Sequence, residues 1–281
     1  MAFHMEYFRS SLASGVTDVL QQVSFVASGV LAPSGSAGLQ VSASLSKLHS
    51  LFGVGANLER IQPQAASFLP VPYPDLAGNN VGTAMNTPAT VWDFSRNPKV
   101  MRPTETLNIF ASQISAGAET ETVFVQFTDG LVTAAPPIST VPNSNGNGMF
   151  FTAHATATTT LTANAFTQVT PLLDLPLPAG QYALVGARVM SAKALAFRMA
   201  PINEPLWRPG APAVQASTDL DYPAARFMNP LTGYVSHWGV WLTFFQNTVP
   251  NVQIFSTAAD TKEDFWFDMI KISDVVTVAA L

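Results

Sequence analysis

The sequence predicts a mainly β protein, in which an antiparallel β-sandwich of about eight strands follows a helical and extended N-terminal arm. After residue 103, short apolar–polar alternations recur between turn residues, with no helical crossover pattern between them. Before residue 103, apolar residues recur at steps of three and four, or the chain is dense in proline and glycine. We therefore predict an arm over residues 1–103 and a β domain over residues 104–281.

The predicted arm begins with two candidate amphipathic helices. The segment PSGSAG separates them, and the chain from residue 61 to residue 103 is rich in proline, which is excluded from helix interiors. We expect this last stretch to be extended and residues 1–57 to be dispensable for folding of the β domain. The apolar stripes are Phe8, Leu12, Val16, Val19, Val23, Val26 and Val30 in the first helix, and Val41, Leu45, Leu48, Leu51 and Phe52 in the second.

The predicted strands of the β domain are joined by turn-rich segments. Two of them, HWGVWLTFFQ and DFWFDMIKIS, are apolar on both faces, so we expect both of their faces to be covered. The eight segments are TLNIFASQI, AETETVFVQFTDG, TAHATATTTLTANAFT, PAGQYALVGARV, ALAFRMAP, HWGVWLTFFQ, NVQIFST and DFWFDMIKIS.

Charge is scarce in this chain. Charged residues make up 11% of the sequence, whereas soluble domains carry about 25%. Because a monomer needs surface charge for solubility, the composition favours a surface covered by a membrane, a partner or further copies of the chain. The net charge is −5 and the 13 basic residues are scattered, which argues against a nucleic-acid groove and against sequence-specific nucleic-acid binding.

The sequence shows no pattern typical of catalysis or of a cofactor. It has no cysteine, and its four histidines are far apart. Asp219 and Asp221 could bind a cation from one side of an extended segment, but no further oxygen ligand lies near them in the sequence. Glu119 and Glu121 lie beside Gly117 in what we interpret as a solvated turn and not as the carboxylate pair of a glycosidase. We therefore predict no catalytic residue, no cofactor and no metal site, and expect a protein that is not an enzyme. The N-terminus lacks a secretory pattern and no run of about 20 apolar residues occurs, so we expect synthesis in a cytoplasm.

The segment TAHATATTTLTANAFT carries no charged residue. Its alternating alanine and threonine side chains are too short to fill a deep core, but they can lie closely against another protein surface. We predict that Thr156, Thr158 and Thr160 belong to an assembly interface. Trp207 and Arg208, in the long connection from Asn203 to Ser236, are predicted to belong to it as well.

Taken together, the almost uncharged N-terminal third, the eight strands, the WRPGAP loop, the Thr/Ala-rich strand and the absence of cysteine resemble a viral capsid protein with a jelly-roll fold, of the kind found in bacteriophages. The resemblance implies a shell subunit that self-assembles into an icosahedral particle through lateral β-domain contacts and the arm. Its implied partners are further copies, with other capsid proteins or an internal membrane as additional ones. It also implies a location in the virion after assembly in the host cytoplasm. A double jelly roll would require the first third of the chain to be β.

Two other classes of function stay open. One is a β-sandwich binding module, such as a carbohydrate-binding or fibre domain, which an aromatic platform on one face would favour. The other is an enzyme on a β scaffold, which a pocket with several carboxylates or histidines would favour. The tryptophans that bear on the first alternative are interpreted here as mostly core residues: Trp207, Trp238, Trp241 and Trp266.

Overall fold

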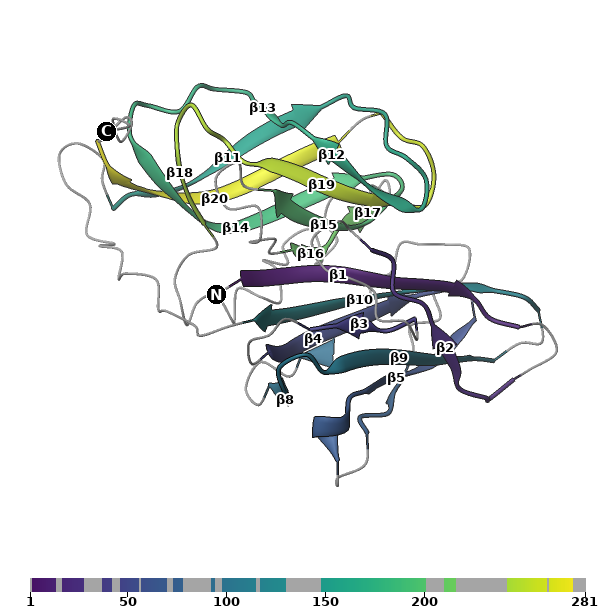
Figure 1. Ribbon diagram of the computed structural model, residues 1–281. Coiled ribbons are helices and arrows are strands. Elements are labelled where there is room, and N and C mark those ends of the chain that lie inside the picture. Colours follow the sequence, from purple (N-terminus) through teal and green to yellow (C-terminus); the bar gives the residue numbers. More distant parts are fainter. Residues whose placement is uncertain are drawn as a thin grey trace. The chain divides into compact units, whose positions relative to one another are not determined.

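The computed structural model divides the chain into two compact units, residues 1–133 and 134–281 (Figure 1). This division differs from the predicted boundary at residue 103. The structure describes residues 2–13, 17–27, 37–41, 46–55, 57–69, 73–77, 92–93, 98–114, 117–129, 148–200, 210–215, 242–261 and 263–274.

The first unit contains two antiparallel sheets. One has the order β1-β10-β4-β7, with β8 also paired to β4, and the other has the order β2-β9-β5-β6, with β3 also paired to β9. A single turn of 3-10 helix, η1 (Ala66–Phe68), follows β5. The strands are β1 (Ala2–Ser11), β2 (Gln21–Val23), β3 (Leu39–Gln40), β4 (Ser46–Val54), β5 (Leu58–Gln64), β6 (Leu76–Ala77), β7 (Trp92–Asp93), β8 (Lys99–Met101), β9 (Thr106–Gln113) and β10 (Thr120–Asp129).

The second unit also contains two sheets, with orders β13-β11-β20-β14-β17 and β12-β19-β15-β16, and β18 pairs with β14. Among the described strands, β14 pairs with β17 in parallel and the other pairings are antiparallel; an isolated bridge between Ala163 and Ser256 is also parallel. The strands are β11 (Phe150–Ala157), β12 (Ala165–Val169), β13 (Leu172–Leu173), β14 (Gln181–Ser191), β15 (Ala194–Ala200), β16 (Gly210–Pro212), β17 (Val214–Gln215), β18 (Leu242–Phe245), β19 (Asn251–Ser256) and β20 (Glu263–Ser273).

The two units share one strand order. In each, the last strand lies between the first strand and a long middle strand, as β1-β10-β4 and as β11-β20-β14. The facing sheets, β2-β9-β5-β6 and β12-β19-β15-β16, match strand for strand. Strands that are distributed between two facing antiparallel sheets in this order are consistent with a jelly-roll-like sandwich. The predicted mainly β, antiparallel sandwich is confirmed, and each of the eight predicted segments contributes a strand; the part of HWGVWLTFFQ before Leu242 lies outside the described residues.

The predicted helical arm is wrong. Its described residues form strands of the first unit, including β1, β4 and β5, and η1 is the one helical turn among them. Because β1 and β4 flank β10 on both sides, these two strands are structural parts of the first unit, and we expect their removal to disrupt its folding. No helix in the described part of the chain has the length and apolar character needed to cross a membrane.

A β-bulge explains why β4 resembles a helix in sequence. The pairing of β4 with β10 shifts register between Gln126 and Phe127, so that Ser50 opposes Gln126 and Leu48 opposes Phe127. His49 is the extra residue. A bulge places residues three apart on the same face, and Leu48 and Leu51 both enter the core. Their helical spacing therefore comes from an irregular strand.

The core of the first unit lies between its two sheets and depends on a close approach at Gly53. A Cβ atom on Gly53 would lie 2.3 Å from Cδ1 of Ile61 and 2.7 Å from Cδ2 of Leu58. The core comprises Phe8, Leu12, Val23, Phe25, Leu39, Val41, Leu48, Leu51, Leu58, Ile61, Ala65, Phe68, Leu76, Met101, Leu107, Ile109, Ala111, Val123, Val125 and Phe127.

We expect Gly53→Ala to lower the free energy of unfolding by about 1–3 kcal/mol, because the added methyl overpacks this contact. Denaturant unfolding measures the loss. The double variant Gly53→Ala/Ile61→Val removes the nearest clashing atom and should lose less than the sum of the two single variants. Additive losses would show that Ile61 does not set the packing at residue 53.

Candidate assembly surface

Strand β11 places its alanines inward and its hydroxyl groups outward. It pairs with β20 over its whole length and with β13 at Ala155 and Thr156. Ala155 and Ala157 are buried, whereas Thr152 is exposed and Thr156 is half-buried. The strand ends at Ala157, and the three threonines that follow lie outside it. The sequence predicted the two faces of this strand but not that the alanine face would lie in the core of the chain itself.

A polar row crosses the outward face of the same sheet and links its strands. His154 lies between two carboxylates, with Nδ1 2.6 Å from Asp174 and Nε2 3.4 Å from Asp264. Its ring also lies 5.2 Å from that of Trp266. Only the imidazolium form has an N–H on both ring nitrogens, so the protonated ring can donate to both carboxylates at once. This row connects β11 and β20 with the segment after β13.

A buried carboxylate lies farther along this face. Asp268 is 2% exposed, and its Oδ1 accepts hydrogen bonds from Nη2 of Arg188 and Oγ1 of Thr152, both at 2.6 Å. The three residues come from β20, β14 and β11, so this contact joins three adjacent strands. It gives the centre of the sheet a charged anchor beneath its half-exposed surface.

Exposed apolar side chains lie at the edge of this sheet. Among the described strands, β13 lies at one edge of this sheet, next to β11. Leu172 in this strand is 74% exposed, and Leu175, just after it, is 77% exposed. Leu172 pairs with Thr156, so the two side chains lie on the same face. We define the β11–β13 surface as Thr152, His154, Thr156, Thr158, Thr160, Leu172 and Leu175.

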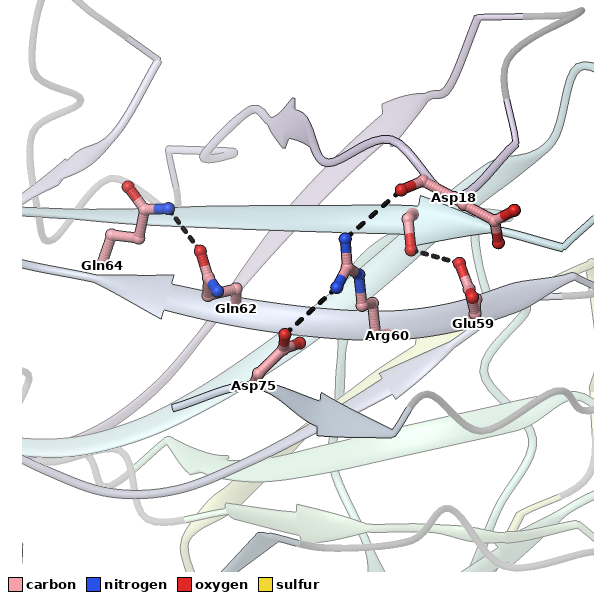
Figure 2. Close-up of polar contacts among 7 residues, drawn as sticks. Asp18, Glu59, Arg60, Gln62, Gln64 and Asp75 are labelled. Carbon is pink, nitrogen blue, oxygen red and sulfur yellow. Dashed lines mark hydrogen bonds and ion pairs between the residues drawn. The ribbon is translucent and has the colours of Figure 1, made fainter. Parts of the chain in front are cut away.

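The first unit offers a contrasting face along β5 (Figure 2). Arg60 forms an ion pair with Asp75 at 3.2 Å and donates to the backbone carbonyl of Asp18 at 3.3 Å. Along the same strand Gln64 donates to Gln62 at 2.6 Å. These groups are half-exposed or exposed and satisfy one another, as expected of a solvated sheet face.

The predicted interface residues have different outcomes. Thr158 and Thr160 are exposed and Thr156 is half-buried in the isolated chain, so their burial in an assembly stays a prediction. Trp207 and Arg208 lie outside the described residues, as do Asp219 and Asp221.

Two sequence interpretations are corrected. Trp266 is half-buried on the outward sheet face and is not a core residue. Glu121 is not in a solvated turn but is completely buried within β10. It lies in phase with the inward residues Val123, Val125 and Phe127, and this alternation was the signal that could have located it.

The described residues contain no group of three or more histidine, aspartate or glutamate side chains arranged to hold a metal ion. The hollow in the second unit carries no titratable group and offers no acid, base or nucleophile. It is lined by Leu173, Leu177, Leu184, Met199, Phe244, Val249, Pro250, Phe267 and Met269.

No family model and no curated protein matches this chain. Among solved structures, it is similar to the crystal structure of the major capsid protein of Bacteriophage PM2, with 9% sequence identity and a TM-score of 0.24, over 96% of this chain and 98% of that one.

We expect Asp268→Asn to lower the free energy of unfolding by about 3 kcal/mol, because it leaves the guanidinium of Arg188 without its carboxylate. Asp174→Asn is the matched control. Asp174 is 54% exposed, so its ion pair with His154 should contribute less than about 1 kcal/mol. Equal losses in denaturant unfolding would contradict the assignment of Asp268 as the anchor.

Proposed function

We propose that this chain is a structural subunit of a virus capsid, which assembles with further copies through its β-sandwich units. The role does not involve the N-terminal arm that the sequence predicted, because those residues are strands of the first unit. In this proposal the chain resides in the virion and is assembled in the host cytoplasm.

The observation that carries the proposal is the β11–β13 surface. Leucines that are about three-quarters exposed on a monomer are costly, and edge strands readily pair with other chains unless they are protected. Here the exposed Leu172 pairs with Thr156, two residues before the uncharged and partly exposed segment Thr158–Thr160. A second copy covering this surface would bury apolar area without burying an unpaired charge, since threonine hydroxyls can bond to nearby backbone groups.

Two further features support a shell subunit. Only 11% of the residues are charged, which suits a chain whose surface is largely in contact with other protein. The hollow described in the second unit has an apolar lining without a titratable group.

A binding module is the second candidate, and the position of Trp266 favours it. A half-buried tryptophan beside Asp264 and His154 on an open sheet face is an arrangement that can stack against a sugar ring. The Trp266 ring already lies in a tilted contact with the ring of His154. Screening soluble glycans by tryptophan fluorescence, with Trp266→Ala as the control, tests this candidate separately from assembly.

We expect the purified chain to form particles far larger than its 29.9 kDa monomer, as measured by light scattering and electron microscopy. Thr158→Arg introduces a charge without a partner at the proposed contact and should raise the critical concentration for assembly about tenfold or more, equivalent to about 1.4 kcal/mol. Leu172→Glu should have the same effect. Both sites are exposed, so the melting temperature should be nearly unchanged.

Thr158→Ala is the matched control, because it changes the same side chain without adding charge and should assemble normally. Normal assembly of both the Thr158→Arg and Leu172→Glu variants would show that the β11–β13 surface is not a contact. A wild-type chain that stays monomeric at high concentration would contradict the capsid role itself.

Assembly should depend only weakly on salt. Charged contacts are screened within about 8 Å at physiological ionic strength, whereas apolar burial is strengthened by excluded salts such as sulfate. Light scattering across a NaCl series should therefore show intact particles from low to moderate concentration. Dissociation over that range would mean that ion pairs dominate the contacts.

A further inference from the structure

Each unit has one completely buried glutamate at the beginning of its last strand. Glu121 is the second residue of β10 and Glu263 is the first residue of β20, and both are 0% exposed. Since β10 and β20 occupy the same place in their sheets, the two carboxyls lie at matching positions in the two units. Each also lies in phase with the inward residues of its strand.

Neither carboxyl has a side-chain hydrogen-bond donor among the described residues: Glu121 has no partner at either oxygen, and the one donor near Glu263 is the backbone N–H of Thr159. A buried carboxylate without a donor is strongly unfavourable, whereas the neutral acid is tolerated far better. The geometry of both sites therefore suits a protonated carboxyl and opposes an ionised one.

A second carboxylate accompanies each buried glutamate and takes the available donors. Beside Glu121, Glu119 accepts from Nδ2 of Asn57 at 2.7 Å. Beside Glu263, Asp260 accepts from Oγ of Ser191 at 2.6 Å. The second carboxylate thus adds negative charge close to the buried carboxyl and accepts the side-chain hydrogen bond that the buried carboxyl lacks.

The other charged neighbours are few. Arg9 of β1 is the cation that favours ionisation of Glu121, but its guanidinium already donates to Oγ1 of Thr122 at 2.6 Å. At Glu263, Asp264 adds further negative charge, and the backbone of Thr159 provides the only opposing influence among the described residues.

The space around Glu121 depends on a glycine. A Cβ atom added to Gly55 would lie 1.3 Å from Oε2 of Glu121 and 2.2 Å from its Cδ. The carboxyl therefore occupies the volume that any other residue at position 55 would fill. The absence of a side chain at Gly55, directly after β4, therefore leaves the space that the Glu121 carboxyl occupies.

We propose that Glu121 and Glu263 are a matched pair of proton-operated latches, one in each unit. While protonated, each carboxyl stays inside and holds the neighbouring strand ends closed; on losing its proton, each moves toward solvent and opens them. The strand ends are those of β1, β4 and β10 in the first unit and of β11, β14 and β20 in the second. The latches do not depend on the proposed capsid role.

The direction of the pH effect follows from linkage. Burial, together with the companion carboxylates, raises the pKa of Glu121 and that of Glu263 to about 7 from the ordinary 4.5. A folded-state pKa above the unfolded one gives stability that is complete below about pH 4.5 and is lost as the pH rises through about 7. The equilibrium constant for opening should therefore rise about tenfold per pH unit between 5 and 7 and then level off.

His49 titrates in the opposite sense. It is buried in β4, 2.8 Å from Oγ1 of Thr128, and burial followed by the charge of Lys47 lowers its pKa to about 3. Its contribution to stability is lost as the pH falls below its unfolded value of about 6.5. Comparisons between variants at one pH remove this contribution.

Opening at Glu263 has a consequence for the β11–β13 surface. Glu263 pairs with Ala157, and its carboxyl lies beside the backbone of Thr159. Movement of this carboxyl would therefore affect the segment Thr158–Thr160 directly. If that segment is an assembly contact, as proposed above, proton loss would alter how it is presented.

Hydrogen exchange of the full chain at pH 5.5 and 7.5, expressed as protection factors, tests the latches. In the wild type, protection at the starts of β10 and β20 and at Thr158–Leu161 should fall by ten-fold or more at the higher pH. Glu121→Gln, a neutral analogue of the protonated acid, should abolish this change in the first unit only. Glu263→Gln should abolish it in the second unit only, so each variant is the control for the other.

Gly55→Ala should displace Glu121 and lower protection at the start of β10 at both pH values. Carbon-13 carboxyl titration of the wild type provides a test that needs no variant, with midpoints near 7 expected for the two glutamates. Ordinary midpoints, or an unchanged pH dependence in both glutamine variants, would overturn the proposal. Particle size measured in the same samples keeps this result separate from the capsid role.

Discussion

The pairing of the first strand of each unit with its last strand is the contact on which the rest of the structure depends. Strand β1 pairs with β10 along its entire length, and β11 pairs with β20 in the same manner. Arg9 and Thr122, joined by a hydrogen bond across the first of these pairings, are 113 residues apart in the chain. Because of this non-local pairing, removal of the first strand of a unit would leave one edge of its last strand, β10 or β20, without a partner. The non-local pairing also predicts slow folding, because the loop entropy must be overcome before the contacts form.

This constraint explains which parts of the fold could be predicted from the sequence. The strands after residue 103 alternate regularly, and the inward positions of Val123, Val125 and Phe127 follow directly from that alternation. The N-terminal third was misinterpreted because β4 contains a bulge and β2 and β3 are only two or three residues long. Local periodicity cannot reveal that β10 needs partners on both sides, since those partners are distant in sequence.

The same reasoning applies to the candidate sites. The alternation of alanine and threonine in β11 predicted two different faces but not which of them is buried, and the exposure of Thr158 and Thr160 leaves their burial in an assembly a prediction. The exposed Leu172 was not singled out, because a two-residue edge strand has no periodic signal. Asp268 and Arg188 looked like ordinary strand residues, and only the register of β14 against β20 brings them within 2.6 Å. Sites that depend on register are beyond what spacing along one strand can indicate.

Scarcity of charge and non-local pairing combine at the two buried glutamates. A chain with few ionisable groups has few means of responding to pH, and here two of them lie at the strand pairings that close the units. Their immediate neighbours differ: Gly55 makes room for one carboxyl, while Ser191 and Asp260 flank the other. Chance placement would not require a buried carboxyl without a side-chain donor at the same point of both sandwiches, because an apolar side chain there would be more stable. The recurrence within one chain, despite different surroundings, therefore argues that the position in the fold, rather than local packing, accounts for the buried acid.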